Sequence, residues 1–235
     1  MIVHENPRIS QWALGEMRKR MDRDRTGHPP HASELGRCLR ASVLSRRTKQ
    51  DYDTTSLLFF ATGYAMQDWF LGEEDESVEY MGVLFSVDRM PKDHILEFKT
   101  TRKSYESLPK GPDGKGVRGA DKVKFDPVAN ESWIQRTRWY CAVHGVRKAH
   151  ILVFFLFQTV FSAWTLEFTE AELEEARLEI MERRDVFNKH LAGGTLPHVA
   201  YRLGDGWECT RCPFYEEHCI QDLKKAGAVV VREEA

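Results

Sequence analysis

The distribution of the cysteines constrains this chain of 235 residues more than any other feature. Cys38 lies near the N-terminus, whereas Cys209, Cys212 and Cys219 lie together in a polar segment near the C-terminus. Three thiols in a polar segment are not typical of core residues, and clustered cysteines in a protein without an export signal more often bind metal than form disulfides. The cysteines therefore predict a metal-bound clamp between the two ends of the chain.

The kind of metal stays open on spacing alone. A four-thiolate site suits zinc, and it also suits a 4Fe-4S cluster. Zinc ribbons usually supply two close pairs of cysteines, so an arrangement of one remote and three close cysteines is less usual for them. The fifth cysteine, Cys141, fits neither group and is predicted to be an ordinary core thiol.

Composition indicates a water-soluble protein of one domain, or of one domain with an appendage. Apolar residues make up 42% and charged residues 30% of the chain, as in ordinary globular proteins. The longest apolar stretch, 151–157, is too short to cross a bilayer and is typical of a buried strand. The N-terminus lacks the apolar region of a secretory signal, so we expect a cytoplasmic protein with no membrane association.

Charge is unevenly distributed although the net charge is only -2. Residues 1–50 contain 11 Lys and Arg against 5 Asp and Glu, whereas residues 73–79 and 170–182 are acidic. A basic N-terminal region permits a polyanion-binding face. Charge alone, however, favours an ordinary solvated helix surface.

Capping, turn and periodicity signals predict an alternation of helices and strands. Asn6-Pro7 opens the first helix, Ser33 caps the second, and Thr169 with Glu172 forms a capping box for the last long helix. The expected helices span 7–25, 33 to beyond 40, 57–71, 132–144 and 169–193, the expected strands span 79–89, 94–101, 149–158 and 162–168, and a long loop spans 106–130. This order predicts an α/β protein with a mixed central sheet.

The second informative feature is Asp88 followed by Glu97-Phe98-Lys99. Glu97 and Lys99 point to one face of a strand, and an antiparallel preceding strand returns Asp88 to them. Two carboxylates of this kind favour magnesium or manganese, and a nearby lysine can position water or stabilise charge on a phosphate. An acid-x-lysine triplet is common, so the alternative is a surface strand with an ion pair.

In their order along the chain, these features resemble the PD-(D/E)xK nucleases of the RecB type. The resemblance is to the iron–sulfur branch, which includes the CRISPR-associated Cas-four exonucleases, AddB-type nuclease domains and phage relatives. It runs from about Ser33 to Cys219. The parts that carry it are Cys38-Leu39-Arg40, the helix with Gly63 and Gln67, Asp88, Glu97-Phe98-Lys99-Thr100-Thr101, Gln135, and the three C-terminal cysteines.

The resemblance implies a restriction-endonuclease-like core with a mixed central sheet flanked by helices, and a cysteine-ligated cluster subdomain. Residues 1–32 would form an N-terminal helix and linker, 33–196 the nuclease core, and 197–235 the cluster segment. Asp88, Glu97 and the main-chain carbonyl of Phe98 would bind the catalytic divalent metal, and Lys99 would be the catalytic lysine. Gln135 and Tyr140 would help to position DNA and the active site, and Cys38, Cys209, Cys212 and Cys219 would hold a 4Fe-4S cluster.

Three positions depart from the family pattern. Gln67 stands where the family often has a metal-ligating histidine, so we expect at most weak ligation there. The tyrosine that usually follows the glutamine by four residues is replaced by Trp139, with Tyr140 one further on. Phe85 occupies the position of a glycine that usually precedes the aspartate by three residues.

These features together predict a metal-dependent DNA nuclease, an exonuclease acting on single strands or on DNA ends. Basic and polar residues expected to contact the phosphate backbone are Arg37, Arg40, Arg46, Arg47, Thr100 and Lys103, together with the 110–124 loop. Expected partners are DNA and CRISPR adaptation or recombination proteins. Two alternatives remain: a nuclease-fold module that binds DNA or a partner without catalysis, and a zinc-stabilised nucleic-acid-binding protein.

Overall fold

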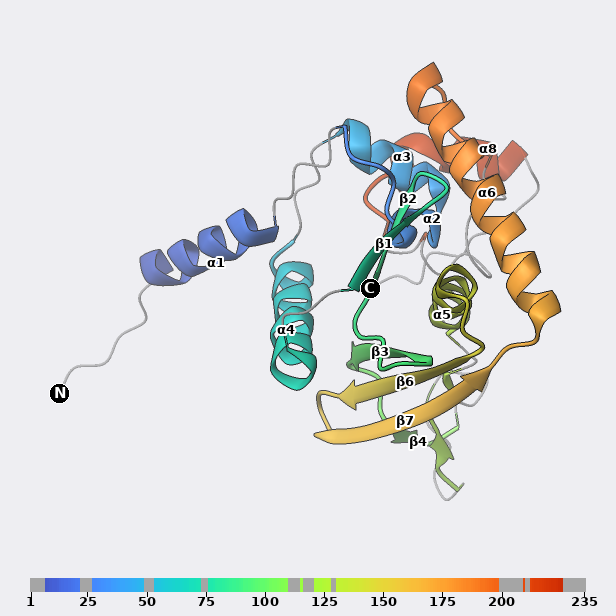
Figure 1. Cartoon of the computed structure of the whole chain (residues 1–235). Helices are drawn as coiled ribbons and strands as arrows, with labels where there is room; N and C mark the ends of the chain where they lie inside the picture. Colours follow the sequence, from blue (N-terminus) through green and yellow to red (C-terminus); the bar gives the residue numbers. More distant parts are fainter. Residues whose placement is uncertain are drawn as a thin grey trace.

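The computed structural model describes residues 7–21, 27–48, 53–72, 76–109, 115, 121–127, 130–198, 209 and 212–225. Groups of helices alternate with groups of strands along the chain (Figure 1). The elements are α1 (Pro7–Met21), α2 (Ala32–Leu35), α3 (Leu39–Arg47), α4 (Thr54–Leu71), β1 (Glu76–Tyr80), β2 (Val83–Val87), β3 (His94–Thr101), β4 (Glu106–Ser107), β5 (Val123–Lys124), α5 (Glu131–His144), β6 (Lys148–Phe155), β7 (Val160–Glu167), α6 (Glu170–Gly193), α7 (Tyr215–His218) and α8 (Ile220–Lys225).

The central sheet has the strand order β3-β6-β7. β3 is parallel to β6, and β6 is antiparallel to β7. Parallel neighbours need a long crossover connection, and here that connection contains α5. The predicted α/β architecture with a mixed central sheet and flanking helices is confirmed.

Helices cover both faces of this sheet (Figure 1). On one face, Ile151, Val153 and Phe155 pack against α5 through Trp133 and Ile134. On the other face, Phe98 and Phe154 pack against the C-terminal half of α4. Alternation of side chains along β3 and β6 explains this division, because neighbouring residues of a strand point to opposite faces.

The predicted strand at 79–89 is wrong in one respect, because this range contains the end of β1, a turn and all of β2. β1 and β2 pair antiparallel around a turn at Met81 and Gly82, which have φ values of 51° and 74°. Two successive residues with positive φ form the tight turn that suits the twist of antiparallel strands. After β2 the chain still returns antiparallel to β3, since Arg89 and Leu96 exchange backbone hydrogen bonds of 3.2 and 2.8 Å.

The predicted helix beginning at Ser33 is two short helices. His31, not Ser33, caps α2, and it forms a capping box with Glu34. Gly36 ends α2, and Cys38 precedes the first residue of α3. A Cβ on Gly36 would lie 2.9 Å from Cγ of Arg136 on α5, so the break lets α5 approach closely.

Other boundaries agree with the sequence signals. α1 begins at Pro7, and α6 begins after the Thr169–Glu172 capping box and ends before Gly194, whose φ is 69°. The predicted end of the first helix near residue 25 lies outside the described residues. Residues 110–114, 116–120 and 128–129 of the expected 106–130 loop lie outside them too, and its described parts include the short antiparallel pair of β4 and β5.

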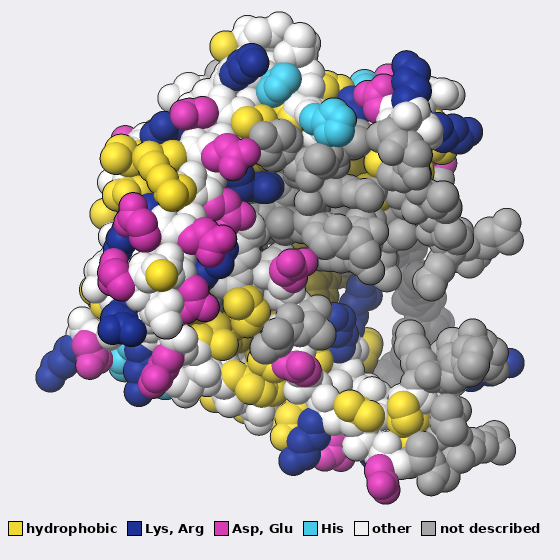
Figure 2. Space-filling view, turned by 90° about the vertical axis from the view of Figure 1, so that its right-hand side faces the viewer, with side chains coloured by type: hydrophobic (Ala, Val, Ile, Leu, Met, Phe, Trp, Pro, Cys, Tyr) yellow, Lys and Arg dark blue, Asp and Glu magenta, His cyan; other side chains and the backbone are white. Residues whose placement is uncertain are grey.

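The long helix α6 contacts α2, α3 and α5 and so holds these helices together. Arg183 of α6 is buried, and it donates hydrogen bonds of 2.6 Å to the carbonyls of Leu35 and Arg37. The side of the molecule that carries α6 has acidic and basic side chains interspersed (Figure 2), as expected for a solvated helix surface. Within the described ranges, every helix is too short or too polar to cross a membrane.

Candidate functional site

Asp88 lies directly opposite Glu97, because the Arg89–Leu96 bridge fixes the register between the end of the hairpin and β3. The Oδ2 atom of Asp88 accepts a hydrogen bond of 2.6 Å from the backbone N–H of Phe98. A carboxylate that accepts a backbone hydrogen bond is held in one orientation. The structure therefore brings Asp88 and the Glu97-Phe98-Lys99 segment together.

Glu97 and Lys99 form a close ion pair at this point. Lys99 Nζ donates to Glu97 Oε1 and, at 3.2 Å, to the carbonyl oxygen of Phe98. Glu97 is only 3% exposed, and its Oε2 atom has no hydrogen-bond partner among the described residues. Burying an uncompensated carboxylate oxygen is costly, and a cation at that oxygen would remove the cost.

Gln67 of α4 completes this group, which we call the carboxylate site: Gln67, Asp88, Glu97, Phe98 and Lys99. Its Nε2 atom donates a hydrogen bond of 2.9 Å to Asp88 Oδ1. One turn earlier, Gly63 faces β3, where a Cβ would lie 3.2 Å from Thr100 Oγ1. The missing side chain lets α4 lie close to β3, and this brings Gln67 within reach of Asp88.

The donors of the carboxylate site fit a hard divalent cation. Asp88, Glu97 and the Phe98 carbonyl supply oxygen atoms only, and magnesium and manganese prefer such ligands. In the described part of the chain, no three His, Cys, Asp or Glu side chains are grouped so as to hold a metal ion. A site of two carboxylates would need a main-chain carbonyl and water to complete its coordination.

Gln135 and Tyr140, the other two predicted catalytic residues, lie in a different environment. Gln135 donates to Glu179 of α6, and Trp139 donates to the same carboxylate at 2.8 Å. Tyr140 is 3% exposed and packs edge-on against Phe85. Their catalytic role stays a prediction. Glu179 could not be singled out from the sequence, because nothing there distinguishes it from the other acidic residues of α6.

Two of the arginines predicted to contact DNA have buried side chains that pair with carboxylates of the protein. Arg46 forms a bidentate ion pair with Glu34, with both N–O distances 2.7 Å and side chains only 7% and 2% exposed. Arg40, whose side chain is 6% exposed, pairs with Asp222 of α8 at 2.8 Å. These ion pairs hold the guanidinium groups against the protein, and contact of Arg40 and Arg46 with DNA stays a prediction.

The other predicted DNA contacts have partners within the protein as well. Arg37 donates to Ser42, and Arg47 donates to three carbonyls at the C-terminal end of α6. Lys103 donates to Asn130 at 2.7 Å, and Thr100 faces Gly63. Of these four residues Lys103 and Arg47 are exposed. Their contact with DNA stays a prediction.

The cysteines predicted to form the clamp lie where α3 begins and where the C-terminal helices pack. Cys209 and Cys219 are buried with Tyr215 and Leu223, and Cys212 packs against them. None of the five cysteines of the chain forms a disulfide. Cys38 precedes the first residue of α3, and among the described residues the cysteines are not grouped so as to hold a metal ion, so the clamp stays a prediction.

Burial dominates the acidity of these thiols. It raises the pKa of Cys219 to about 11, and the nearby Arg40 guanidinium opposes this rise. Burial also raises the pKa of Cys212. Cys141 lies apart and fully buried, with its pKa raised to about 12 by burial. The prediction that it is a core thiol is confirmed.

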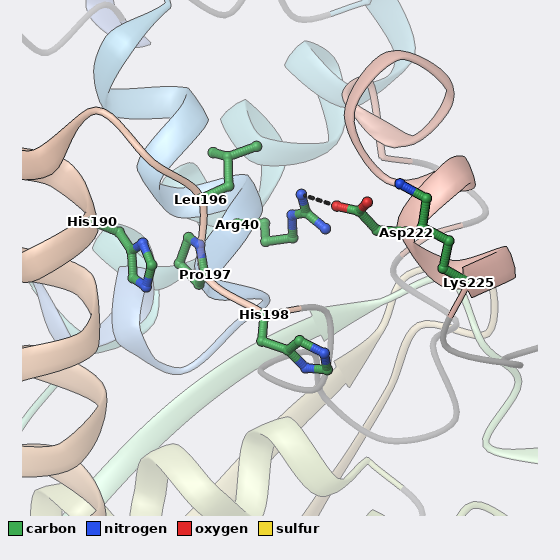
Figure 3. Close-up of a pocket in the computed structure, with 7 residues that line it drawn as sticks. All are labelled: Arg40, His190, Leu196, Pro197, His198, Asp222 and Lys225. Carbon is green, nitrogen blue, oxygen red and sulfur yellow. Dashed lines mark hydrogen bonds and ion pairs between the residues drawn. The ribbon is translucent and has the colours of Figure 1, made fainter.

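A cavity of about 580 Å³ lies beside this region, between α3, the end of α6 and α8 (Figure 3). Arg40 and Asp222 meet in it as an ion pair. The lining residues are Arg40, His190, Leu196, Pro197, His198, Asp222 and Lys225. None of them belongs to the carboxylate site, so the cavity and the carboxylates are separate features.

The fold resembles solved structures only distantly. No model of a known protein family matches the sequence, and no curated protein is significantly similar to it. The crystal structure of SSO0001 is 12% identical, covers 92% of this chain and 97% of its own, and superimposes with a TM-score of 0.52. This likeness shows that the two proteins share a fold.

An alkaline exonuclease from Laribacter hongkongensis, LHK-Exo, is also similar to this chain. It is 12% identical and covers 70% of this chain and 90% of its own, with a TM-score of 0.39. Its complex with dAMP is 10% identical and covers the same 70% and 90%, with a TM-score of 0.41. TM-scores below 0.5 are too low to support an inference about activity.

Proposed function

We propose that this protein is a divalent-metal-dependent deoxyribonuclease. The observation that carries the proposal is the convergence of Asp88, Glu97 and Lys99 around a buried carboxylate oxygen without a described partner. Two carboxylates can bind a divalent metal that activates water for hydrolysis of a phosphodiester. A lysine beside them can stabilise the negative charge that develops on the phosphate. A surface strand with an ordinary ion pair would not leave Glu97 buried in this way.

Each residue of the site has a distinct task in this proposal. Asp88, Glu97 and the Phe98 carbonyl would hold magnesium or manganese, which activates water and neutralises charge on the phosphate when bound. Lys99, fixed by its bonds to Glu97 and to the Phe98 carbonyl, directs its positive charge to the place where the phosphate becomes more negative. The Phe98 N–H keeps Asp88 turned toward this place.

A cleavage assay with and without metal tests the proposal. We expect the purified protein to degrade end-labelled DNA in magnesium or manganese, and to lose all cleavage in EDTA because both carboxylates then lack their cation. Restored cleavage after excess metal is returned separates chelation from damage. Cleavage that continues unchanged in EDTA, or no cleavage in any divalent metal, would contradict the proposed activity.

We further propose that the enzyme is an exonuclease on single strands or DNA ends, as the family resemblance implies. Circular and linear forms of the same single-stranded DNA distinguish this from endonuclease action. An exonuclease degrades the linear form and leaves the circular form intact. Association with CRISPR adaptation or recombination proteins is part of the same proposal, and co-purification from the native host tests it.

We propose a 4Fe-4S cluster on Cys38, Cys209, Cys212 and Cys219. Support comes from the number and type of donors and from the packing of Cys209, Cys212 and Cys219 in one cluster. The cluster would connect the start of α3 to the C-terminal helices, where the Arg40–Asp222 ion pair already joins α3 to α8. The function of such a cluster is to hold these segments together, away from the carboxylate site.

Replacing Cys209 by serine is expected to remove the bound iron and the absorption near 400 nm, because one thiolate ligand is lost. Iron analysis and absorption spectra after anaerobic purification provide the measurement. The matched control is Cys141→Ser, which removes a buried thiol outside the group and should keep the iron. A colourless wild-type protein containing stoichiometric zinc would contradict the 4Fe-4S cluster and support a zinc site instead.

A second candidate is a nuclease-fold module that binds DNA or a partner without catalysis. The hydrogen bonds that Asp88 accepts from Gln67 and Phe98 favour it, because both carboxylate oxygens already have a donor. DNA binding without hydrolysis in magnesium, manganese, cobalt or calcium would establish this function instead.

A further inference from the structure

Gln67 extends from α4 to the carboxylate site. The side chain is half-buried and reaches Asp88 through its Nε2 atom at 2.9 Å. Its neighbour Asp68, by contrast, is exposed. The inner surface of α4 therefore presents an amide to the two carboxylates of the proposed metal site.

The hydrogen bond determines which end of the amide meets Asp88. An ionised carboxylate only accepts hydrogen bonds, so the NH₂ group must face it, while the amide oxygen would be repelled. An amide nitrogen has no lone pair available for a metal ion. At the point of contact with Asp88, Gln67 is thus a donor to a metal-ligand candidate and supplies no ligand atom itself.

Asp88 is consequently held between two donors on opposite elements. Gln67 donates to Oδ1 from α4, and the Phe98 N–H donates to Oδ2 at 2.6 Å from β3. Together they fix the plane of the carboxylate. Donors that orient a ligating carboxylate typically change metal affinity by about 10- to 100-fold when they are removed.

The same contact leaves oxygen as the only donor element at the site. Asp88, Glu97 and the Phe98 carbonyl are all hard oxygen ligands, and magnesium suits such a set. A nitrogen donor raises affinity for manganese and later transition metals more than for magnesium. A nitrogen ligand at position 67 would therefore shift the ratio of the two affinities toward manganese.

We infer that Gln67 is a positioning residue that orients Asp88 and, because its amide supplies no nitrogen ligand, keeps the site from gaining the preference for manganese over magnesium that a nitrogen ligand would give. This inference rests on the proposed metal-dependent function. It assigns to Gln67 a role in metal preference that is distinct from weak ligation through its amide oxygen.

Calorimetric titration of the full chain with magnesium and with manganese tests the inference without any activity measurement. We expect Gln67→Ala to weaken both metals about tenfold with an unchanged ratio of affinities, because only the orientation of Asp88 is lost. We expect Gln67→His to shift the ratio toward manganese by about tenfold, because a ring nitrogen is added. The matched control, Asp68→Asn, should leave the ratio unchanged.

The contrary outcomes distinguish a failure of the proposed metal site from a failure of the role of Gln67. Wild-type metal affinity equal to that of Asp88→Ala would overturn the proposed metal site and the inference with it. Normal wild-type affinity, combined with unchanged affinity in Gln67→Ala or an unchanged ratio in Gln67→His, would overturn the role of Gln67 alone. Thermal melting of each variant checks folding, and Gln67→Asn, whose shorter amide falls short of Asp88, should reproduce Gln67→Ala.

Discussion

Replacing Lys99 by alanine is expected to reduce DNA cleavage by on the order of a thousandfold while leaving DNA binding in place. The ammonium group is fixed by Glu97 and by the Phe98 carbonyl, so its charge is already directed when a phosphate arrives. Its loss removes stabilisation of the transition state and leaves the metal-binding carboxylates intact. Initial rates on end-labelled DNA, with affinity measured separately in calcium, provide the measurement.

Asp88→Asn extends this prediction to the metal ligand. We expect no detectable cleavage, because an amide in place of the carboxylate removes both the negative charge and one acceptor for its hydrogen-bond donors. Asp93→Asn is the matched control, since Asp93 is an exposed carboxylate on the turn before β3. If Lys99→Ala and Asp88→Asn both cut DNA at the wild-type rate, the carboxylate site is not the active site.

Replacing Glu34 by alanine is expected to destabilise the fold by about 3–5 kcal/mol, because it leaves the Arg46 guanidinium buried without its counter-charge. Both members of the pair are almost fully buried, and Arg46 also donates to the carbonyls of His28 and Pro29. For a protein of this size the loss corresponds to a fall of roughly 10 °C in melting temperature. Denaturant titration and thermal melting measure it.

Glu174→Ala is the control for this prediction. Glu174 pairs with Arg177 at 2.8 Å on the surface of α6, where its side chain is 61% exposed. Exposed pairs contribute less than about 1 kcal/mol, so the control should melt close to the wild type. A loss of stability in Glu34→Ala no larger than in Glu174→Ala would show that the buried pair does not stabilise the fold.

Local signals in the sequence predicted the elements well where one residue type has a strong backbone preference. Pro7 at the start of α1, the Thr169–Glu172 capping box and Gly194 at the end of α6 are local features, and the structure has them as expected. The hairpin of β1 and β2 was missed because Met81 is not a residue that usually adopts positive φ. The break at Gly36 was missed because its cause, the approach of Arg136, is a tertiary contact.

The site residues likewise divide into those whose positions follow from the local sequence and those whose partners depend on tertiary contacts. The positions of Asp88 and Glu97 follow from strand alternation and a short turn, so their approach could be predicted from the sequence. The partners of Arg40 and Arg46 could not be predicted, because Asp222 lies 182 residues from Arg40 in the chain and Glu34 becomes a partner only when α2 packs against α3. A list of basic residues in the sequence therefore does not show which of them form ion pairs inside the protein.

By itself the sequence determined the order of helices and strands, the mixed sheet, and the segment in which two carboxylates and a lysine meet. These follow from local backbone preferences and from the period of side chains along a strand. Only the tertiary structure decided that Gln67 donates to Asp88 and that Glu97 is buried. It also decided that Arg40 and Arg46 form ion pairs inside the protein. Such contacts join residues far apart in the chain, and their geometry depends on how the helices pack.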